Sequence, residues 1–243
     1  AAAAVLRQAG ARHGVALRLH KGLPSGSGLG SSAASAVAGA WAANLLLDEP
    51  LPREALVEAV LEGEAVASGS RHGDNVLPAL FGGLVLVSAS DPTCYRRIPL
   101  PGPLSIALIL PRVEILTRTA REILPRQVTL QDAVHNASAL AFLIDAFRAG
   151  DWETVGRWMM ADRIVEPVRA RLVPCYEPVR RAALSAGAFG CALTGSGPAM
   201  FALARDEMHA RQVLSAMREA CLESGVELEG YVTAVDFEGA RQL

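Results

Sequence analysis

Lysine is almost absent from this sequence, since Lys21 is the only one among 23 lysine and arginine residues. A site that needs a chain lysine therefore has a single candidate. Aromatic residues make up only 5% of the chain, although apolar residues reach 51%. No apolar run approaches the roughly 18 residues that indicate a membrane span. The formal net charge of −2 excludes a strongly basic protein, so we expect neither nucleic acid nor a membrane surface as the main partner.

Metal-binding and redox motifs are missing as well. The cysteines have neither the spacing of zinc ligands nor a CxxC pair, and the five histidines are scattered along the chain. We therefore predict reduced thiols in a cytoplasmic protein. The cysteines are Cys94, Cys175, Cys191 and Cys221.

The length of the chain allows one large domain or two small ones. Because the pattern of predicted helices and strands changes near Ser105, we predict an α+β protein with two domains, 1–104 and 105–243. The alternation of Val15, Leu17 and Leu19 predicts a strand over 14–20 with one buried face. The other expected elements are buried or amphipathic helices at 33–47, 52–68, within 119–160 and at 177–186, strands at 84–87 and 104–110, a hairpin of 191–194 with 200–204, a helix at 207–224 and a strand at 230–237.

A glycine-rich segment follows the first predicted strand. Gly26, Gly28 and Gly30 alternate with small residues, and Ser31 and Ser32 begin the next predicted helix. Glycines let the backbone approach a phosphate closely, and the N–H groups at a helix start point toward it. The segment is neither a Walker loop, which needs lysine directly before Ser31, nor a Rossmann loop, which needs glycine in place of Ser31. On the glycines alone, a tight connection without a ligand is an equal alternative.

Glu64 lies on the apolar face of the predicted helix 52–68, because it follows Val57 by seven residues. A carboxylate on that face needs a hydrogen bond, a cationic partner or a metal to offset its desolvation. Periodicity leaves open that the side chain bends out to water at the helix end. The other glutamates of this helix recur every four residues as an ordinary solvated stripe, and they are Glu54, Glu58 and Glu62.

The sequence Pro-Ser-Gly-Ser-Gly-Leu-Gly-Ser-Ser-Ala-Ala, which begins at Pro24, resembles the phosphate-binding motif of the GHMP kinases. The resemblance implies that this segment binds the phosphates of ATP. It also implies that Ser32, at the start of one helix, and Glu64, in the next, hold Mg²⁺. The phosphate-binding residues so implied are Pro24, Ser25, Gly26, Ser27, Gly28, Leu29, Gly30, Ser31, Ser32 and Ala33.

The block Ser68–Asn75 is similar to the Ser-Gly-Ser-x-His-x-Asp-Asn loop of the homoserine kinases, one group of the GHMP kinases. That resemblance implies that His72, Asp74 and Asn75 line the pocket for the amino-acid substrate. From the residues alone we expect a polar loop that leads into a hydrophobic strand.

Two later segments also resemble homoserine kinases, namely Thr117-x-x-Ala-Arg121 and Glu166-Pro-x-Arg169. They imply that Thr117 belongs to the substrate site and that Arg121 and Arg169 bind the substrate carboxylate, for which the planar guanidinium is suited. Without the resemblance, surface ion pairs would be the ordinary interpretation of both arginines.

The segment Gly187–Pro198 resembles the third GHMP kinase motif, with Thr194 where serine is usual. The resemblance implies that its hairpin turn, with Gly195, Ser196 and Gly197, abuts the phosphate loop and the substrate pocket. The glycines also suit a tight hairpin turn.

Taken over about Val15 to Leu243, the resemblance implies the GHMP kinase fold: an amino-terminal domain like domain 2 of ribosomal protein S5 and a ferredoxin-like carboxyl-terminal domain. The opening motif of homoserine kinases does not occur here, so we expect a chain that lacks the amino-terminal segment and has an incomplete first domain.

The activity implied is the phosphorylation of the L-homoserine hydroxyl by ATP with Mg²⁺, in threonine biosynthesis. The same resemblance suggests a cytoplasmic enzyme that forms a homodimer, and it assigns no dedicated catalytic base. One alternative is another GHMP kinase, acting on a sugar, an isoprenoid alcohol or a different hydroxy-amino acid. Another is an inactive fragment that only folds or dimerises.

Overall fold

The computed structural model describes residues 1–115 and 117–242, apart from the side chains of residues 67, 68, 117 and 118. The chain divides into two compact units. The first unit comprises residues 1–25, 30–99 and 236–243, and the second unit comprises residues 26–29 and 100–235. The domain limits at 104 and 105 stay a prediction.

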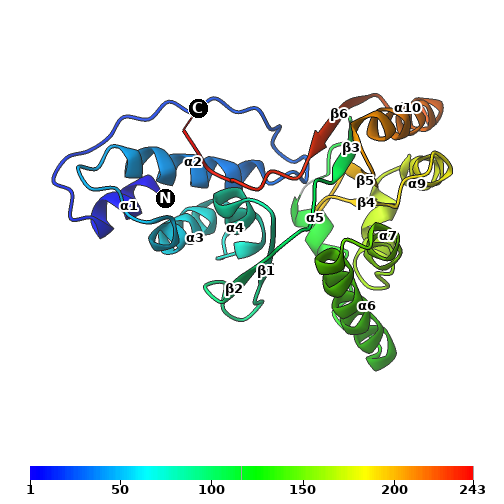
Figure 1. The fold of residues 1–243 in the computed structure, drawn as a ribbon, viewed down its shortest axis with the longest axis horizontal. Helices are drawn as coiled ribbons and strands as arrows, with labels where there is room; N and C mark the ends of the chain where they lie inside the picture. The colour runs from blue at the N-terminus through cyan, green and yellow to red at the C-terminus, as the bar shows by residue number, and fades with distance from the viewer. Residues whose placement is uncertain (116, 243) are drawn as a thin grey trace. The chain divides into compact units, whose positions relative to one another are not determined.

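The first unit is built from helices around one apolar core. Helix α1 (Ala2–Gln8), which the sequence did not predict, lies beside α2 (Ser31–Leu45) and α3 (Val57–Ser68), as Figure 1 shows. Helix α2 contributes buried Ala33, Ala40 and Ala43, whose small side chains permit close helix packing. The remaining elements are the 3₁₀ turn η1 (Arg53–Leu56), helix α4 (Gly73–Phe81), and strands β1 (Leu84–Val87) and β2 (Tyr95–Ile98), which pair antiparallel.

The helix predicted at 33–47 is confirmed as α2, but only one of its faces is buried. Ala38 is exposed, and Leu45 is 40% exposed. The helix predicted at 52–68 is confirmed as η1 followed directly by α3.

The prediction of a strand at 14–20 is wrong. This segment has no regular secondary structure and runs as a long loop between α1 and α2 (Figure 1). Leu17 and Leu19 are 44% and 52% exposed, so the alternation has no buried side. A strand is stabilised by hydrogen bonds to a neighbouring strand, and within the described residues no strand pairs with it.

The polar loop predicted at 68–75 is also partly wrong, because helix α4 begins at Gly73 and places Asp74 and Asn75 in its first turn. The apolar side chains of α4 that face the core are Val76, Leu77, Leu80 and Phe81. Their spacing is helical, and burying them stabilises a helix where the sequence predicted a loop leading straight into β1.

The carboxyl-terminal segment from Asp236 onward belongs to the first unit although β6, the strand before it, belongs to the second. Arg53 holds this segment. Its guanidinium donates to the carbonyl of Leu80 at 3.1 Å, to that of Ala240 at 2.6 Å and to that of Glu238. The same guanidinium lies 4.8 Å from the centre of the Trp41 ring, a cation–π contact.

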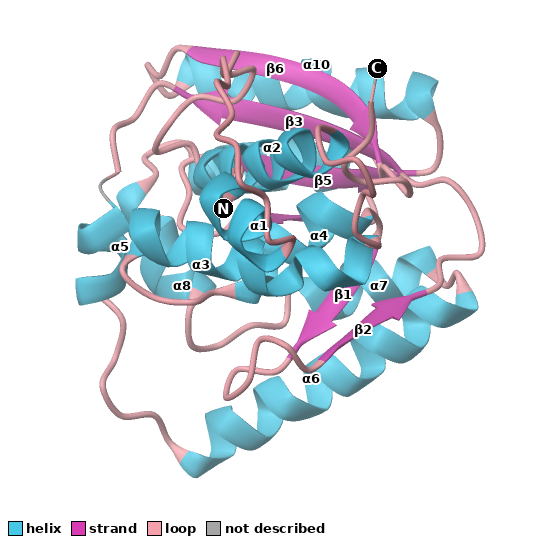
Figure 2. Ribbon diagram, turned by 90° about the vertical axis from the view of Figure 1, so that its left-hand side faces the viewer, coloured by secondary structure: helices cyan, strands magenta, loops and turns pink. Residues whose placement is uncertain are grey.

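The second unit contains a four-stranded antiparallel sheet in the order β4-β5-β3-β6. The strands are β3 (Ser105–Pro111), β4 (Gly190–Leu193), β5 (Met200–Ala204) and β6 (Leu228–Ala234). Figure 2 shows α10 (Glu207–Glu223) running along β3, β5 and β6. Strand β3, helix α9 (Tyr176–Ser185), β4, β5, α10 and β6 follow one another as the ferredoxin-like βαββαβ arrangement.

The sequence predicted the elements of this sheet correctly. The hairpin, the long helix after it and both flanking strands are present within a few residues of their expected limits. Helices between 119 and 160 are also confirmed. The second unit also contains the helices α5 (Thr117–Glu122), α6 (Leu130–Ala149), α7 (Trp152–Met159) and α8 (Glu166–Arg169) and the 3₁₀ turn η2 (Ala170–Leu172).

Within the described part of the chain, no helix combines the length and apolar character that crossing a bilayer requires.

Candidate active site

Three glycines give the segment before α2 its shape. Gly26, Gly28 and Gly30 have φ angles of +71°, +77° and +72°, the left-handed region that other residues rarely adopt. Gly30 is the residue that precedes the first turn of α2. Residues 26–29 belong to the second unit, and the chain from Gly30 onward belongs to the first.

In the first unit, the start of α2 has no side-chain cap and no acidic residue in its first turn, within the described residues. Ser31 does not cap the helix, because its hydroxyl donates to the carbonyl of Leu23 at 2.8 Å. The N–H groups of a first helical turn lack intrahelical acceptors and carry a partial positive charge. This helix start is chemically suited to an anion such as a phosphate.

Ser32 and Glu64 come together at this helix start. The Ser32 hydroxyl donates to Glu64 Oε2 at 3.3 Å, and Glu64 is only 6% exposed. By contrast, Glu58 and Glu62 are exposed and pair with Arg71 and Arg7. The prediction that Glu64 lies on the apolar face of its helix is thereby confirmed. Two oxygen donors, one of them a carboxylate, form the kind of ligand set that Mg²⁺ prefers.

These two residues form a small set, and the described residues contain no group of three or more His, Cys, Asp or Glu side chains that could hold a metal. Such a small set fits Mg²⁺ nonetheless, because this ion usually keeps several waters and is bound through one or two protein groups together with substrate phosphates.

The residues implied in substrate binding lie at the start of α4. His72 is the residue before the helix, and Asp74 and Asn75 are in its first turn. All three are exposed. Asn75 lies against the glycine segment, because a Cβ atom added to Gly30 would be 3.1 Å from Asn75 Oδ1. The structure thus brings one of the three next to the start of α2.

In the second unit, residues 26–29 pack against the turn between β4 and β5. The N–H of Ala199 donates to the carbonyl of Ser27 at 3.3 Å. A Cβ atom added to Gly28 would lie 2.8 Å from the carbonyl oxygen of Gly197 and closer still to that of Thr194. Only glycine fits between these carbonyls. The contact between this segment and the turn of the third motif is therefore confirmed.

Arg169 and Arg121 lie near each other in the second unit. Arg169 Nη1 donates to the carbonyl of Gly195 at 2.9 Å, and its Nε donates to that of Ala120 at 3.3 Å. Burial lowers the pKa of Arg169, and the positive charge of Arg121 lowers it further. Two neighbouring guanidinium groups favour an anion beside them. The Thr117 side chain lies outside the described residues.

Comparison with known proteins shows which protein family the chain is related to. Residues 1–83 match the GHMP kinases N terminal domain, and residues 143–222 match the GHMP kinases C terminal domain. The homoserine kinase of Thermococcus kodakarensis is 46% identical over 220 residues, which cover 89% of this chain and 72% of that protein. The homoserine kinase of Chlorobium phaeobacteroides (strain DSM 266) is 41% identical over 229 residues, covering 93% and 71%. This chain belongs to the homoserine kinase family.

Solved structures agree with this assignment. The crystal structure of homoserine kinase from Cytophaga hutchinsonii has a TM-score of 0.93 and 40% identity, and the match covers 98% of this chain and 75% of that one. The mevalonate kinase of L. major matches with a TM-score of 0.71 at 19% identity over 92% of this chain and 69% of that one, which shows the shared fold alone. The GHMP kinase fold and the family are thus confirmed.

Sequence reasoning missed a second, partly buried carboxylate of this homoserine kinase family member, Glu166. Glu166 Oε1 accepts hydrogen bonds from the Tyr176 hydroxyl at 2.8 Å and from the Leu193 N–H at 2.9 Å. Burial raises the pKa of Glu166, although both hydrogen bonds act in the opposite direction. The motif that contains Arg169 also contains Glu166, but nothing in the sequence indicated these partners, which lie 10 and 27 residues away.

Asp162 was also missed. Its carboxylate accepts hydrogen bonds from the Ile164 N–H at 2.8 Å, from the Glu166 N–H at 2.7 Å and from the Asn136 side chain at 2.6 Å. Partial burial acts to raise the pKa of Asp162, but the hydrogen bonds outweigh it and the pKa lies below its usual value of 3.8. The residue fixes the start of α8, the helix that ends at Arg169.

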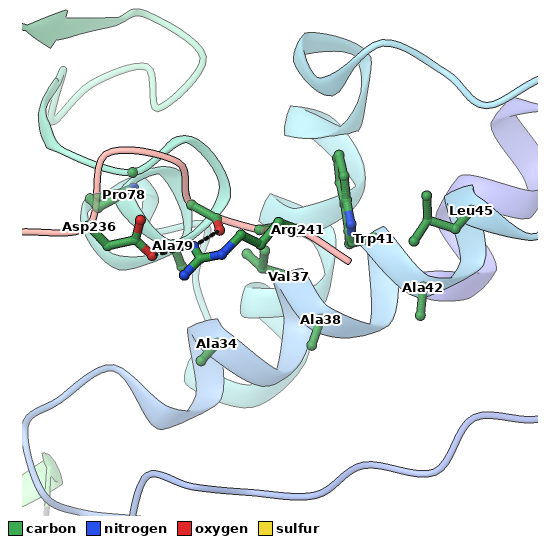
Figure 3. A pocket seen from close by; sticks show the side chains of 13 residues that line it. Ala34, Val37, Ala38, Trp41, Ala42, Leu45, Pro78, Ala79, Asp236 and Arg241 are labelled. Atoms are coloured by element: carbon green, nitrogen blue, oxygen red, sulfur yellow. Dashed lines mark hydrogen bonds and ion pairs between the residues drawn. The ribbon is translucent and has the colours of Figure 1, made fainter. Parts of the chain in front are cut away.

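An open groove of about 500 Å³ in the first unit contains none of the predicted site residues. Alanines of α2, the end of α4 and the carboxyl-terminal segment line it, and Figure 3 shows Trp41 on one side with the ion pair of Asp236 and Arg241 on another. Its lining is mostly apolar and offers no cluster of cations for phosphates. We therefore place the candidate site at the glycine segment instead.

Proposed function

We propose that this chain transfers the γ-phosphoryl group of ATP to the side-chain hydroxyl of L-homoserine, giving O-phospho-L-homoserine for threonine biosynthesis. The observation that carries the proposal is the buried Glu64 beside Ser32 at the uncapped start of α2. It coincides with the position that the GHMP kinase motif reserves for the phosphates and their metal. Membership of the homoserine kinase family supports the choice of acceptor.

The phosphates of ATP would bind along the segment from Pro24 to Ala33. The left-handed conformation of its three glycines lets the backbone approach a phosphate closely, and the start of α2 adds its uncapped N–H groups and partial positive charge. The third-motif turn with Gly195, Ser196 and Gly197 would hold residues 26–29 in place. Backbone rather than a lysine would then supply most of the recognition.

Ser32 and Glu64 would hold Mg²⁺. The ion would supply neutralisation of the charge that develops on the phosphate groups. Glu64 contributes a negative charge at a buried position, and the Ser32 hydroxyl fixes the direction of that carboxylate through their hydrogen bond.

For homoserine, His72, Asp74 and Asn75 would orient the amino and hydroxyl groups. Arg121 and Arg169 would bind the carboxylate, with Thr117 beside them. Arg169 is held by two backbone carbonyls, so its fork is fixed in direction before the substrate arrives. Fixed donors lose less entropy when they bind a ligand.

The reaction needs mainly positioning and charge neutralisation. The homoserine oxygen forms a bond to the γ-phosphorus while the bond between that phosphorus and the ADP oxygen breaks. The hydroxyl proton is released to solvent as the new P–O bond forms, and we assign no residue as its general base. Lys21 is exposed, and its Nζ lies 3.5 Å from the Ser25 hydroxyl at the entrance to the segment.

The remaining proposals follow from the family. We propose a cytoplasmic homodimer that acts on small molecules, without a nucleic-acid or membrane partner.

The acceptor is tested by measuring ADP release and the ³¹P spectrum of the product with homoserine, galactose and mevalonate in parallel. We expect a phosphomonoester with homoserine alone. Turnover of galactose or mevalonate without turnover of homoserine would contradict the proposed substrate, and no turnover with any acceptor would favour an inactive chain.

The role of Glu64 is tested with Glu64→Gln, which keeps the shape and removes the charge. We expect kcat/KM to fall by about 100-fold or more, since a charged group that acts on the transition state contributes several kcal/mol. Glu62→Gln is the matched control, because Glu62 is on the same helix but exposed and paired with Arg7. Equal activity of the two variants at every Mg²⁺ concentration would contradict the metal-binding role.

A further inference from the structure

Helix α8 is bonded to the third-motif turn at two places, both within the second unit. At the start of the helix, Glu166 Oε1 accepts the N–H of Leu193, the last residue of β4, at 2.9 Å. At its end, Arg169 donates to the carbonyl of Gly195 at 2.9 Å. One residue therefore fixes the base of the turn, and the other fixes its tip.

The third-motif turn also fixes residues 26–29 of the glycine segment. Residues 26–29 contact it through the hydrogen bond from Ala199 to Ser27 and through the close approach of Gly28 to the carbonyls of Thr194 and Gly197. Since a Cβ atom at Gly28 would not fit, the two backbones touch with no side chain between them to absorb a shift. A displacement of the turn would therefore move residues 26–29.

Glu166 is itself held firmly. The Tyr176 hydroxyl donates to the same Oε1 at 2.8 Å, and the Glu166 N–H donates to Asp162 at 2.7 Å. The two groups that donate to its carboxylate, the Tyr176 hydroxyl and the Leu193 N–H, are neutral, and these hydrogen bonds, with a smaller contribution from the positive charge of Arg180, offset the cost of partly burying it. These hydrogen bonds give the carboxylate a defined position, and the bond from the Leu193 N–H ties the base of the turn to it.

We propose that Glu166 is a positioning residue for the nucleotide: it sets the third-motif turn and, through that turn, the phosphate-binding residues 26–29. This inference rests on the proposed function, because it assumes that residues 26–29 bind the phosphates of ATP. Glu166 touches neither substrate nor the reacting atoms in this account. Its main effect is on the affinity for the nucleotide; the acceptor depends less on the turn, because Arg169 is bonded to the carbonyl of Ala120 as well as to that of Gly195.

The test compares Glu166→Ala and Glu166→Gln with Glu177→Ala, an exposed glutamate on the neighbouring helix α9. Alanine removes the acceptor of the Leu193 N–H, and we expect the Kd for a non-hydrolysable ATP analogue, measured by calorimetry, to rise by about 10- to 100-fold. The KM for ATP should rise with it, while the KM for homoserine changes by less than about threefold. Glutamine keeps an Oε1 acceptor and should restore analogue binding to within about threefold of the unmodified chain.

Hydrogen–deuterium exchange adds a readout without ligand. Residues 193–199 should exchange faster in Glu166→Ala but not in Glu166→Gln. A folded Glu166→Ala that binds the analogue as tightly as Glu177→Ala would overturn the inference. If Glu166→Ala does not fold, Glu166→Asp decides, because its shorter carboxylate cannot reach both partners: weaker analogue binding supports the inference, and unchanged binding overturns it.

The outcomes also separate this inference from the proposed function. An unmodified chain that binds the analogue but does not phosphorylate homoserine contradicts the proposed acceptor and leaves the role of Glu166 to the comparison above. An unmodified chain that binds no analogue contradicts both.

Discussion

Glu64 and Glu166 are carboxylates taken from water for different purposes. Glu64 is 6% exposed and meets the Ser32 hydroxyl at the end of the glycine segment, where a cation would share its charge. Glu166 meets a hydroxyl and a backbone amide. The face of α3 on which Glu64 lies was predictable from helical periodicity, whereas its burial beside Ser32 followed only from the resemblance to the GHMP kinases. The position of Glu166 was not predictable, because its partners come from β4 and α9, whose packing the sequence pattern does not encode.

The partly buried Asp162 makes stability depend on pH. Because the folded-state pKa of Asp162 lies below 3.8, the unfolded chain binds its proton more tightly, and stability rises with pH between the two pKa values. The contribution of this carboxylate is fully present above its unfolded pKa and is lost as pH falls through its folded pKa. We expect Asp162→Asn to cost about 1–3 kcal/mol in urea unfolding at neutral pH and progressively less below about pH 4. A difference that is constant from pH 3 to pH 7 would contradict this.

The thiols should differ sharply in reactivity. Cys94 is exposed, whereas Cys175, Cys191 and Cys221 are buried. Burial raises the pKa of all three, to about 12 for Cys191 and Cys221. Because the thiolate is the reactive form, we expect a colorimetric disulfide reagent to modify one thiol rapidly in the native protein and the others only on unfolding. Cys94→Ser should abolish the rapid phase; its persistence would show that a buried thiol is accessible.

The structure brings two of these thiols together in a way that the sequence did not indicate. The sulfurs of Cys175 and Cys221 are 3.3 Å apart although the residues are separated by 46 positions. Spacing along the chain cannot predict such a pair, because the packing of α9 against α10 creates it.

At the scale of elements, the sequence predicted helices and strands well where a segment carries a clear local pattern, such as helical periodicity or a glycine-rich hairpin turn. Helix α3 and the β4–β5 hairpin are examples. The prediction of a strand at 14–20 failed, because an alternating segment forms a strand only if another strand pairs with it. The prediction of a loop also failed at α4. There, glycine and polar residues at the helix start concealed the helical spacing of Val76, Leu77, Leu80 and Phe81.

The contact between the glycine segment and the third-motif turn can be tested with two matched substitutions. Gly26 and Gly28 both have positive φ, so alanine at either position costs about 1–2 kcal/mol of backbone strain. A Cβ atom at Gly26 meets nothing within 4 Å, whereas one at Gly28 would collide with backbone carbonyls. We expect Gly28→Ala to lower the free energy of unfolding by about 1–3 kcal/mol more than Gly26→Ala. Equal losses of unfolding free energy for the two variants in urea titrations would show that the turn moves to make room for the added Cβ atom.

At the scale of the whole chain, each unit has its own apolar core. The carboxyl-terminal segment completes the first unit, through Arg53 and through backbone hydrogen bonds such as that from Gly83 to Asp236 at 2.6 Å. If the chain ends at Val235, hydrogen exchange in α4 should accelerate by about tenfold or more, since each lost hydrogen bond to a charged group contributes about 1.5–3 kcal/mol.

Strand β5 provides the internal control for this truncation, because it belongs to the second unit and its exchange should change by less than about twofold. Arg53→Ala should reproduce the effect on α4 in the full chain. Faster exchange in β5 with α4 unchanged would contradict the assignment of residues 236–243 to the first unit.

The assignment of residues 26–29 and 236–243 has a consequence for recombination. Neither unit is one continuous stretch of sequence, since the chain changes unit after Ser25, Leu29, Pro99 and Val235. A gene cut at a single point therefore cannot release either unit intact. A chimera that exchanges the first unit with that of another GHMP kinase must carry three separate pieces of coding sequence, and four codons inside the glycine segment must come from the donor of the second unit.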